Sequence, residues 1–362
     1  MKLEDFRNKK VIVTGHTGFK GSWLSTWLSL LGAKVYGFSN NVPTSPSHFD
    51  SIKSFFEDDI KGDIRDANTF KNYISKIKPD YLFHLAAQSL VNLSYEEPKS
   101  TWETNLIGTV NILDSLRYID NKCIAIFITS DKCYDNLEWT WGYRETDKLG
   151  GPDPYSASKG AAELAISSYF RSYFKKESNI SLASARAGNV IGGGDWSSNR
   201  LIPDCVKAWA NNECVDLRNP FSTRPWQHVL EPIGGYMLLA LALSERKELN
   251  GESFNFGPNL EKNYNVLDVV NEVSKYWEKI EFNLETEKEK LFYESNLLKL
   301  NCDKALHNLN WKACLSFEET ISFTARWYKN FYDNPSTIGS TTTDQINEYS
   351  QLFSKKILSK NV

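Results

Sequence analysis

The sequence predicts an α/β fold built on a doubly wound parallel sheet, with a smaller, mainly C-terminal region beside it. Short apolar runs alternate with amphipathic stretches throughout the first half of the chain. A glycine cluster directly follows the first of these runs. After about Ser184 the alternation loosens and long loops appear. The 362 residues suffice for one large domain or two closely joined ones.

The predicted strands are short runs rich in apolar residues, of the kind buried on both faces of a parallel sheet. They lie at residues 10–14, 33–38, 81–85 and 124–129. Apolar residues at helical spacing predict helices at 22–31 and 106–116, a helix that begins near Pro154, and later helices near 202–210, 232–242 and 266–277. The polar, turn-rich stretch 334–343 predicts a surface segment.

Composition excludes several classes of protein. The net charge of −3 leaves no basic excess for binding nucleic acid. No run of about 18 apolar residues predicts a membrane span, and the N-terminal apolar run is too short for a signal peptide. The six cysteines have no CxxC spacing, so we expect free thiols, no metal site and a cytoplasmic protein.

The glycine cluster places Gly15, Gly18 and Gly21 between the first strand and the first helix. A side chain in this turn would keep the backbone away from a pyrophosphate, and the helix start offers free N–H groups to it. An ordinary strand-to-helix turn is the alternative. The position near the N-terminus, between a clear strand and a clear helix, favours dinucleotide binding, with Thr17 and Phe19 in the same turn.

A second motif pairs Tyr155 with Lys159, four residues apart and on one face if the segment is helical. A nearby ammonium group stabilises a phenolate and lowers the tyrosine pKa, which allows the tyrosine to act as a base. Such pairs are also common on helix surfaces. Ser130 at the end of a predicted strand completes a Ser–Tyr–Lys set, because ligands of open α/β sheets bind beyond the strand ends.

The order of these motifs resembles the extended short-chain dehydrogenase/reductase family, which has a Rossmann fold. The resemblance implies NAD as cofactor, adenine contacts from Asp63 and Ile64, and a cofactor-lining strand end at Leu85, Ala86 and Ala87. It also implies that Asn105 supports the lysine. Capping or turn roles explain Asp63 and Asn105 as well. The second strand ends in Ser39-Asn40, without an acid or an arginine, so NAD or NADP stays open on physical grounds.

Asp131 and Lys132 follow Ser130 where sugar-nucleotide 4,6-dehydratases carry an acidic pair. The run Thr-Ser-Asp-Lys-Cys-Tyr-Asp resembles the CDP-glucose branch of these dehydratases, as do residues 15–23, 139–145, 186–196 and 224–231. The resemblance implies oxidation at sugar C4, loss of water across C5 and C6, and hydride return to C6. Asp131 would be the acid of the elimination. Lys132 would be either a neutral base or a cation that stabilises the enolate.

A nucleotide-sugar diphosphate needs cationic or polar partners, and arginine suits bidentate phosphate contacts. The expected substrate-binding residues are Asn189, Arg200, Arg218 and Arg224, although each arginine could also be a solvated surface charge. Large aromatics are usually buried for their area, so packing is at least as good an explanation for Trp139, Trp141 and Trp196 as contact with substrate. We expect a structural role for His228.

The resemblance divides the chain into a cofactor-binding domain at 1–185, a substrate-binding region at 186–333 and a tail at 334–362. It implies CDP-glucose as substrate, a place in deoxysugar supply for surface polysaccharide, and a homodimer formed through residues 106–116 and 155–173. A sugar-nucleotide 4-epimerase, a dehydratase for another nucleotide sugar and a nucleotide-sensing regulator remain alternatives. The intact Tyr155–Lys159 pair argues against the regulator, and Asp131–Lys132 argues more weakly against the epimerase.

Overall fold

Seven strands form a central sheet in the order β11-β6-β5-β4-β1-β2-β3, and all neighbours in it are parallel. The computed structural model describes residues 2–175, 178–259, 264–277, 280–285 and 297–357. The strand order reverses between β1 and β4, which makes the carboxyl ends of these strands the expected ligand site. The strands are β1 (Lys10–Thr14), β2 (Lys34–Ser39), β3 (Asp58–Lys61), β4 (Tyr81–His84), β5 (Cys123–Ile128), β6 (Ile180–Ala187) and β11 (Ser253–Phe256).

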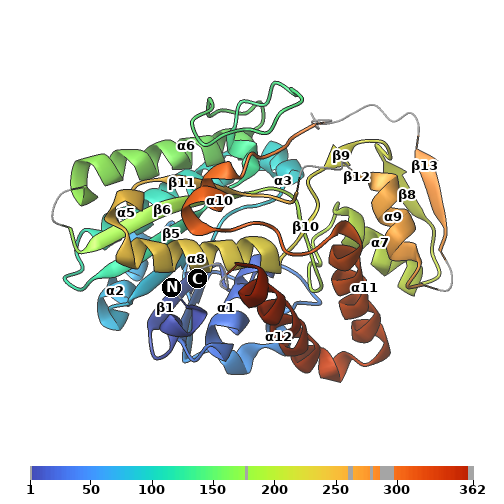
Figure 1. Cartoon of the computed structure of the whole chain (residues 1–362), viewed down its shortest axis with the longest axis horizontal. Coiled ribbons are helices and arrows are strands. Elements are labelled where there is room, and N and C mark those ends of the chain that lie inside the picture. The colour runs from blue at the N-terminus through green and yellow to red at the C-terminus, as the bar shows by residue number, and fades with distance from the viewer. Residues whose placement is uncertain (1, 176–177, 260–263, 278–279, 286–296, 358–362) are drawn as a thin grey trace.

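Helices cover both faces of the sheet (Figure 1). One face packs against α1 (Phe19–Leu30) and α8 (Leu230–Glu245), and α12 (Ile338–Ile357) packs against these two helices. The other face packs against α2 (Ala67–Ile77), α5 (Gly108–Leu116) and α6 (Pro154–Tyr169). Two apolar cores result, one on each side of the sheet. The short helices α3 (Val91–Glu96) and α4 (Pro98–Trp102) precede a π-helical turn, η4 (Glu103–Ile107), and contacts join α6 to all three.

The smaller region lies beyond the carboxyl ends of the sheet strands, on the right in Figure 1. Short strands pair within it: β7 (Val190–Ile191) with β10 (Gln227–His228), β8 (Val215–Arg218) with β13 (Phe282–Glu285), and β9 (Thr223–Arg224) with β12 (Tyr264–Asn265). Its helices are α7 (Leu201–Ala210), α9 (Val266–Ser274) and α11 (Phe317–Asp333). Helix α10 (Asp303–Leu309) returns to the sheet beside β11.

The predicted elements of the first half are confirmed, β1 with the same bounds and the others within a few residues. The predicted division at residue 185 stays a prediction. Strand β6 spans that position, and β11 joins the sheet from beyond it.

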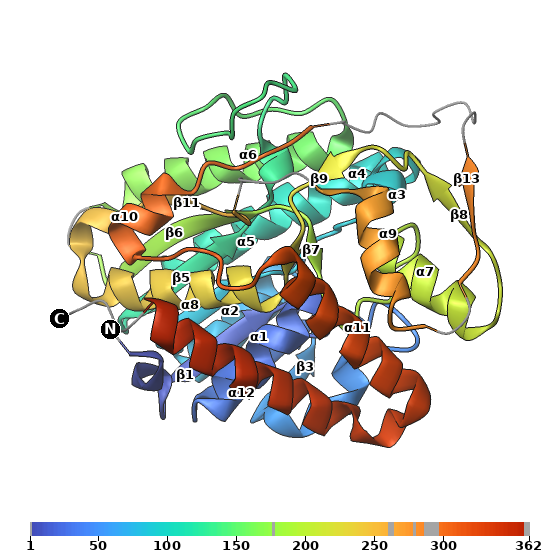
Figure 2. The same ribbon diagram turned by 45° about the vertical axis from the view of Figure 1, so that its right-hand side comes forward.

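The expected surface segment at 334–343 is confirmed for residues 334–337, which are exposed, and is wrong for the buried positions of the helix that follows. Helix α12 begins within it and runs beside α1 (Figure 2). Ile338 and Thr342 are fully buried, and the apolar face continues through Ile346, Tyr349 and Phe353. A polar helix can bury a stripe of residues spaced three or four apart, and that spacing outweighed the polar composition. Residues 358–362 of the predicted tail lie outside the described part of the chain.

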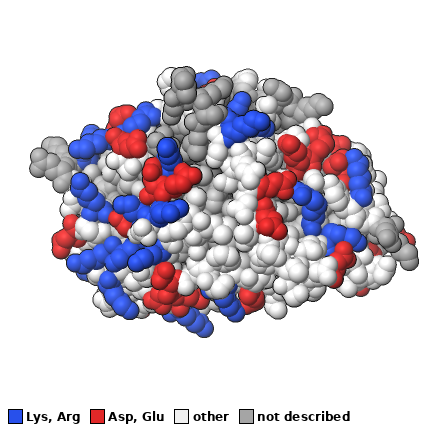
Figure 3. Space-filling view, turned by 60° about the horizontal axis from the view of Figure 1, so that its bottom comes forward, with Lys and Arg blue, Asp and Glu red and all other residues white. Residues whose placement is uncertain are grey.

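Charged side chains of both signs surround the face shown in Figure 3, and the centre of that face is mostly uncharged. All six cysteines are free thiols. Within the described residues, no helix combines the length and the apolar character needed to cross a membrane.

Candidate active site

The glycine-rich turn between β1 and α1 has the geometry of an anion site. Gly15 has φ +74°, and a Cβ there would lie 2.6 Å from the Ala86 nitrogen. A Cβ on Gly21 would lie 2.2 Å from the Gly15 oxygen. Gly18 caps α1 without a side-chain hydrogen bond, so no capping side chain occupies the N–H groups of the first turn. These residues fit the pyrophosphate of a dinucleotide.

The other expected cofactor residues surround this turn. Leu85, Ala86 and Ala87 follow β4 and are half-buried, and the Leu85 N–H donates to the Thr14 oxygen at 3.1 Å. Phe19 opens α1, and the Thr17 hydroxyl donates to the Asn41 oxygen at 2.7 Å.

Asp63 and Ile64 follow strand β3. The Asp63 carboxylate binds the Arg65 guanidinium at 2.6 Å, and a hydrogen bond from Asn40 also helps to lower its pKa. Arg65 therefore stands near the end of β2, where the local sequence shows no charged residue. Ile64 is buried in the core and packs against Gly108, which leaves its backbone as the part able to reach a ligand.

Asn105 is not a helix cap. It lies within the π-helical turn η4 and is 1% exposed. Its amide exchanges two hydrogen bonds with the Gln88 backbone, at 2.9 and 3.0 Å, and donates to the Ser158 hydroxyl at 3.0 Å. It thus joins the turn after β4 to the residue before Lys159. π-Helical turns often mark functional positions, and this one aims Asn105 at α6.

Ser130 and Tyr155 meet at the carboxyl end of β5. Asp153 caps α6 by accepting from the Ser156 N–H at 2.9 Å, which fixes where the helix begins and brings Tyr155 into its first turn. A hydrogen bond joins the Tyr155 and Ser130 side chains, and both residues are buried. Lys159, one turn further along α6, is 6% exposed.

Burial governs the ionisation of this pair. It raises the pKa of Tyr155 to about 12, although the hydrogen bond with Ser130 opposes this shift. Burial also lowers the pKa of Lys159 to about 8. The sequence predicted a lowered tyrosine pKa. Desolvation outweighs the lowering effects of the Ser130 hydroxyl and the Arg200 charge on the Tyr155 pKa.

Asp131 follows Ser130 in the turn η5 (Asp131–Cys133) and is 3% exposed. Its Oδ1 accepts from the Ser130 hydroxyl at 3.0 Å, and its Oδ2 is buried without a hydrogen-bond partner. Burial raises the pKa of the carboxyl, although Lys132 and Lys20 oppose the shift. Such a group is suited to carry a proton. Lys132 is half-buried, and its backbone N–H donates to the Ser130 hydroxyl oxygen at 3.2 Å.

Lys20 is a site residue that the sequence reasoning missed, although it stands inside the glycine motif. It lies in the first turn of α1, and its pKa is lowered to about 8, first by burial and then by the charge of Arg200. Asp131 and Asp195 oppose that shift, so these side chains lie in one electrostatic cluster.

The expected substrate residues are spread over the smaller region. Arg200 precedes α7, pairs with Asp195 at 2.7 Å and helps to lower the pKa of Tyr155, which places it near that tyrosine. Asn189 lies between β6 and β7 and is half-buried. Arg218 ends β8, and its side chain lies outside the described part of the structure.

Arg224 lines a separate cavity of about 200 Å³, whose wall includes Trp226, Tyr264 and Phe317. Tyr155, Ser130 and Asp131 do not line it. The structure therefore brings Arg200 close to Tyr155, whereas Arg224 lines a different cavity.

Trp196 packs in the core against Tyr328 and Phe331, and Trp139 packs against Tyr143, whereas Trp141 is 64% exposed. His228 is fully buried, with its ring beside Phe323. Packing accounts for Trp139, Trp196 and His228.

A model of the family described as GDP-mannose 4,6 dehydratase matches residues 12–324. The chain belongs to this family. Among curated relatives, the CDP-glucose 4,6-dehydratase of Salmonella typhimurium is 46% identical over 331 residues, which cover 90% of this chain and 91% of the relative.

Two solved structures with a similar fold have a lower sequence identity to this chain. The dTDP-glucose 4,6-dehydratase of Bacillus anthracis, in complex with NAD, has a TM-score of 0.73 at 21% identity and covers 91% of this chain and 99% of its own. The UDP-glucuronic acid 4-epimerase of Bacillus cereus, with UDP-glucuronic acid and NAD, has a TM-score of 0.76 at 21% identity and covers 89% and 100%. The predicted doubly wound fold and the predicted family are confirmed.

Proposed function

We propose that this protein is a CDP-glucose 4,6-dehydratase that uses NAD and releases CDP-4-keto-6-deoxyglucose. The observation that carries the proposal is the buried Asp131, which shares a hydrogen bond with Ser130 and leaves one carboxyl oxygen free beside the Ser130–Tyr155 pair. The proposal is supported by the 46% identical relative of that name.

Gly15, Gly18 and the first turn of α1 would hold the pyrophosphate of the cofactor, and Lys159 would bind the hydroxyls of its nicotinamide ribose. When bound, NAD supplies a hydride acceptor that later returns the hydride, and a positive ring that favours a nearby phenolate. Ser130 orients the sugar C4 hydroxyl, and Tyr155 takes its proton. The protonated Lys159 stabilises the Tyr155 phenolate.

Elimination follows once C4 is a ketone, because the ketone acidifies the C5 proton. Asp131 donates its proton to the C6 hydroxyl, which leaves as water. Lys132 stands in the same turn and either removes the C5 proton itself, as a neutral amine, or stabilises the enolate as a cation while water takes that proton. The charge of Arg200 affects the pKa of Tyr155, and Lys20 interacts electrostatically with Asp131. We assign both cations, together with Asn189, Arg218 and Arg224, to binding the nucleotide diphosphate and the sugar.

The experiment that tests this function incubates the purified protein and NAD with CDP-, dTDP-, UDP- and GDP-hexoses in separate reactions. Mass spectrometry then scores the loss of one water from the nucleotide sugar. We expect loss of water from CDP-glucose. A change of sugar configuration without a change of mass would instead support a 4-epimerase, and NAD binding without turnover would support a regulator.

We also propose a homodimer. Exposed apolar side chains follow the helices that the sequence assigned to this contact: Ile107 is 47% exposed, Leu164 63% and Tyr173 50%. An apolar surface on two adjacent helices is typical of a protein–protein contact. The cytoplasmic location and the place in deoxysugar supply also remain proposals.

A further inference from the structure

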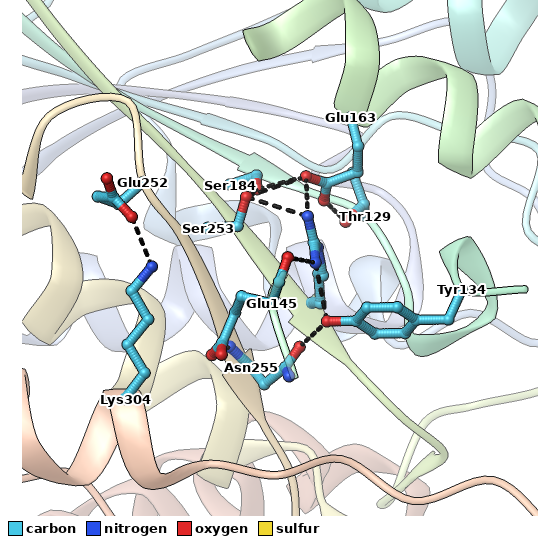
Figure 4. Close-up of polar contacts among 10 residues, drawn as sticks. Thr129, Tyr134, Glu145, Glu163, Ser184, Glu252, Ser253, Asn255 and Lys304 are labelled. Atoms are coloured by element: carbon cyan, nitrogen blue, oxygen red, sulfur yellow. Dashed lines mark hydrogen bonds and ion pairs between the residues drawn. The ribbon is translucent and has the colours of Figure 1, made fainter. Parts of the chain in front are cut away.

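Glu163 is a buried carboxylate on α6, one helical turn after Lys159, and the steps proposed above do not use it. Its side chain is 2% exposed. Oε2 accepts from Ser184 Oγ at 2.7 Å, Arg186 Nη2 at 2.8 Å and Ser253 Oγ at 3.2 Å, and Oε1 accepts from the Thr129 hydroxyl. Figure 4 shows these oxygens and hydroxyls gathered between α6 and the sheet. A buried charge persists only when it is paired and hydrogen-bonded, and this one is both.

The network holds both ends of the turn that carries the elimination residues. Thr129 directly precedes Ser130. On the other side, Arg186 Nη1 donates to the Tyr134 hydroxyl at 2.8 Å, and Tyr134 lies two residues after Lys132. The Tyr134 hydroxyl in turn donates to Asn255 Oδ1 at 2.8 Å, which ties it to β11 (Figure 4). Through this network, Glu163 links the helix of Tyr155 and Lys159 to both ends of the Ser130–Lys132 turn.

The negative charge of Glu163 also affects the ionisation of Lys159. Burial lowers the pKa of Lys159, Glu163 is the largest influence that raises it, and the Cys133 thiol is a smaller one. On the neighbouring elements, the positive charge of Lys159 helps to lower the pKa of Lys20 on α1 and of His84 on β4. Of these groups, Glu163 is the carboxylate able to keep a buried lysine protonated.

We propose that Glu163 is a positioning residue: it keeps Lys159 protonated for its work on Tyr155 and fixes the Ser130–Lys132 turn against α6. The inference rests on the proposed function. It assigns a role in turnover to a carboxylate that touches neither the substrate nor the cofactor.

The test is the pH dependence of kcat with CDP-glucose in three variants. Glu163→Gln removes the charge and keeps the size, so the alkaline decline of kcat is expected to begin about one pH unit lower than in the unmodified protein. Glu163→Asp keeps the charge and shortens the reach, so its kcat falls about tenfold or more while the alkaline decline stays in place. Glu231→Gln controls for the loss of a buried carboxylate away from α6, because Glu231 lies on α8 and, in the described structure, accepts from the Cys314 and Leu315 N–H groups and from Tyr349. All variants are compared at pH values where circular dichroism shows them to be folded.

Two additions keep the test decisive. If Glu163→Gln does not fold, as judged by circular dichroism, the double variant Glu163→Gln/Arg186→Met removes the unpaired guanidinium as well. NAD affinity measured by calorimetry over the same pH range gives a readout without turnover, and its alkaline decline is expected to shift in the same direction. An unmodified protein that binds NAD without turning over CDP-glucose would contradict the proposed function alone. An unshifted alkaline decline in Glu163→Gln, or an equal shift in Glu231→Gln, would overturn the role of Glu163.

Discussion

Tyr155 must ionise in a place where burial raises its pKa to about 12. The Ser130 hydroxyl and the Arg200 charge oppose this shift. The proposed chemistry also depends on a protonated Lys159 and on the positive ring of bound NAD to lower the Tyr155 pKa further. The Tyr155–Lys159 spacing was visible in the sequence. The depth of burial was not, because it depends on packing between segments far apart in the chain.

The substitution Tyr155→Phe removes the proton acceptor and leaves the ring in place. We expect kcat with CDP-glucose to fall by about 10²–10⁴-fold, with little change in the free energy of unfolding. Steady-state kinetics and urea unfolding check both parts. A kcat within about tenfold of the unmodified protein would rule out Tyr155 as the base.

The substitution Asp131→Asn separates oxidation from elimination. The amide cannot protonate the leaving hydroxyl, whereas the Ser130–Tyr155 pair is unaltered. We expect overall turnover to fall by about a hundredfold or more, while the near-ultraviolet absorbance of reduced nicotinamide rises when CDP-glucose is added. If turnover falls and no reduced cofactor accumulates in rapid-mixing experiments, Asp131 acts earlier than proposed.

At the scale of elements, strands buried on both faces were predictable because their apolar runs are continuous. Strand β3 was missed, because Asp58-Asp59-Ile60-Lys61 is a polar sheet edge. Helix α12 was missed for its polar composition, although its buried residues repeat at helical spacing. The pairing of Glu163 with Arg186 joins α6 to β6, and no local spacing predicts it.

Glu231 gives α8 a pH-sensitive attachment to its neighbours. Its carboxylate accepts from the Cys314 and Leu315 N–H groups and from Tyr349 of α12, and burial raises its pKa to about 7. The folded protein therefore binds a proton that the unfolded chain has released between the ordinary glutamate pKa and about 7. Because the folded state binds the extra proton, this carboxyl makes the protein less stable as pH rises through that window.

We accordingly expect the free energy of unfolding of the unmodified protein to fall, relative to Glu231→Gln, by about 3 kcal/mol between pH 5 and pH 8. Urea unfolding of both proteins across this range measures the difference. Parallel pH profiles of the two proteins would show that Glu231 ionises as an ordinary glutamate.

At the scale of the whole molecule, the proposed dimer surface consists of exposed apolar residues on α6 and the adjoining helical turns, including Ile107, Leu164 and Tyr173. Leu164→Glu places a charge in that surface, twice in a symmetric dimer. We expect the dimer dissociation constant to rise at least about tenfold, as measured by sedimentation or light scattering. Leu306→Glu on α10, where the leucine is 46% exposed, serves as the control. A monomeric unmodified protein, or equal effects of both variants, would contradict the proposed surface.

The sheet gathers the site from separate parts of the sequence. Ser130 and Tyr155 come from motifs that were recognised separately, and the structure joins them by a hydrogen bond. Lys20 and Arg200 are distant in sequence and join the same cluster through α1 and the loop before α7. Motif spacing could identify each part, whereas their meeting depends on the parallel strand order.

The most direct test of the central claim follows one hydrogen atom. CDP-glucose carrying deuterium at C4 is incubated with the protein and NAD, and the product is examined by NMR and mass spectrometry. The proposed chemistry predicts a 4-keto-6-deoxy product that carries the deuterium at C6, with no net consumption of NAD. Deuterium retained at C4 without loss of water would contradict dehydration, and deuterium recovered in free reduced cofactor would contradict the return of the hydride to the same sugar.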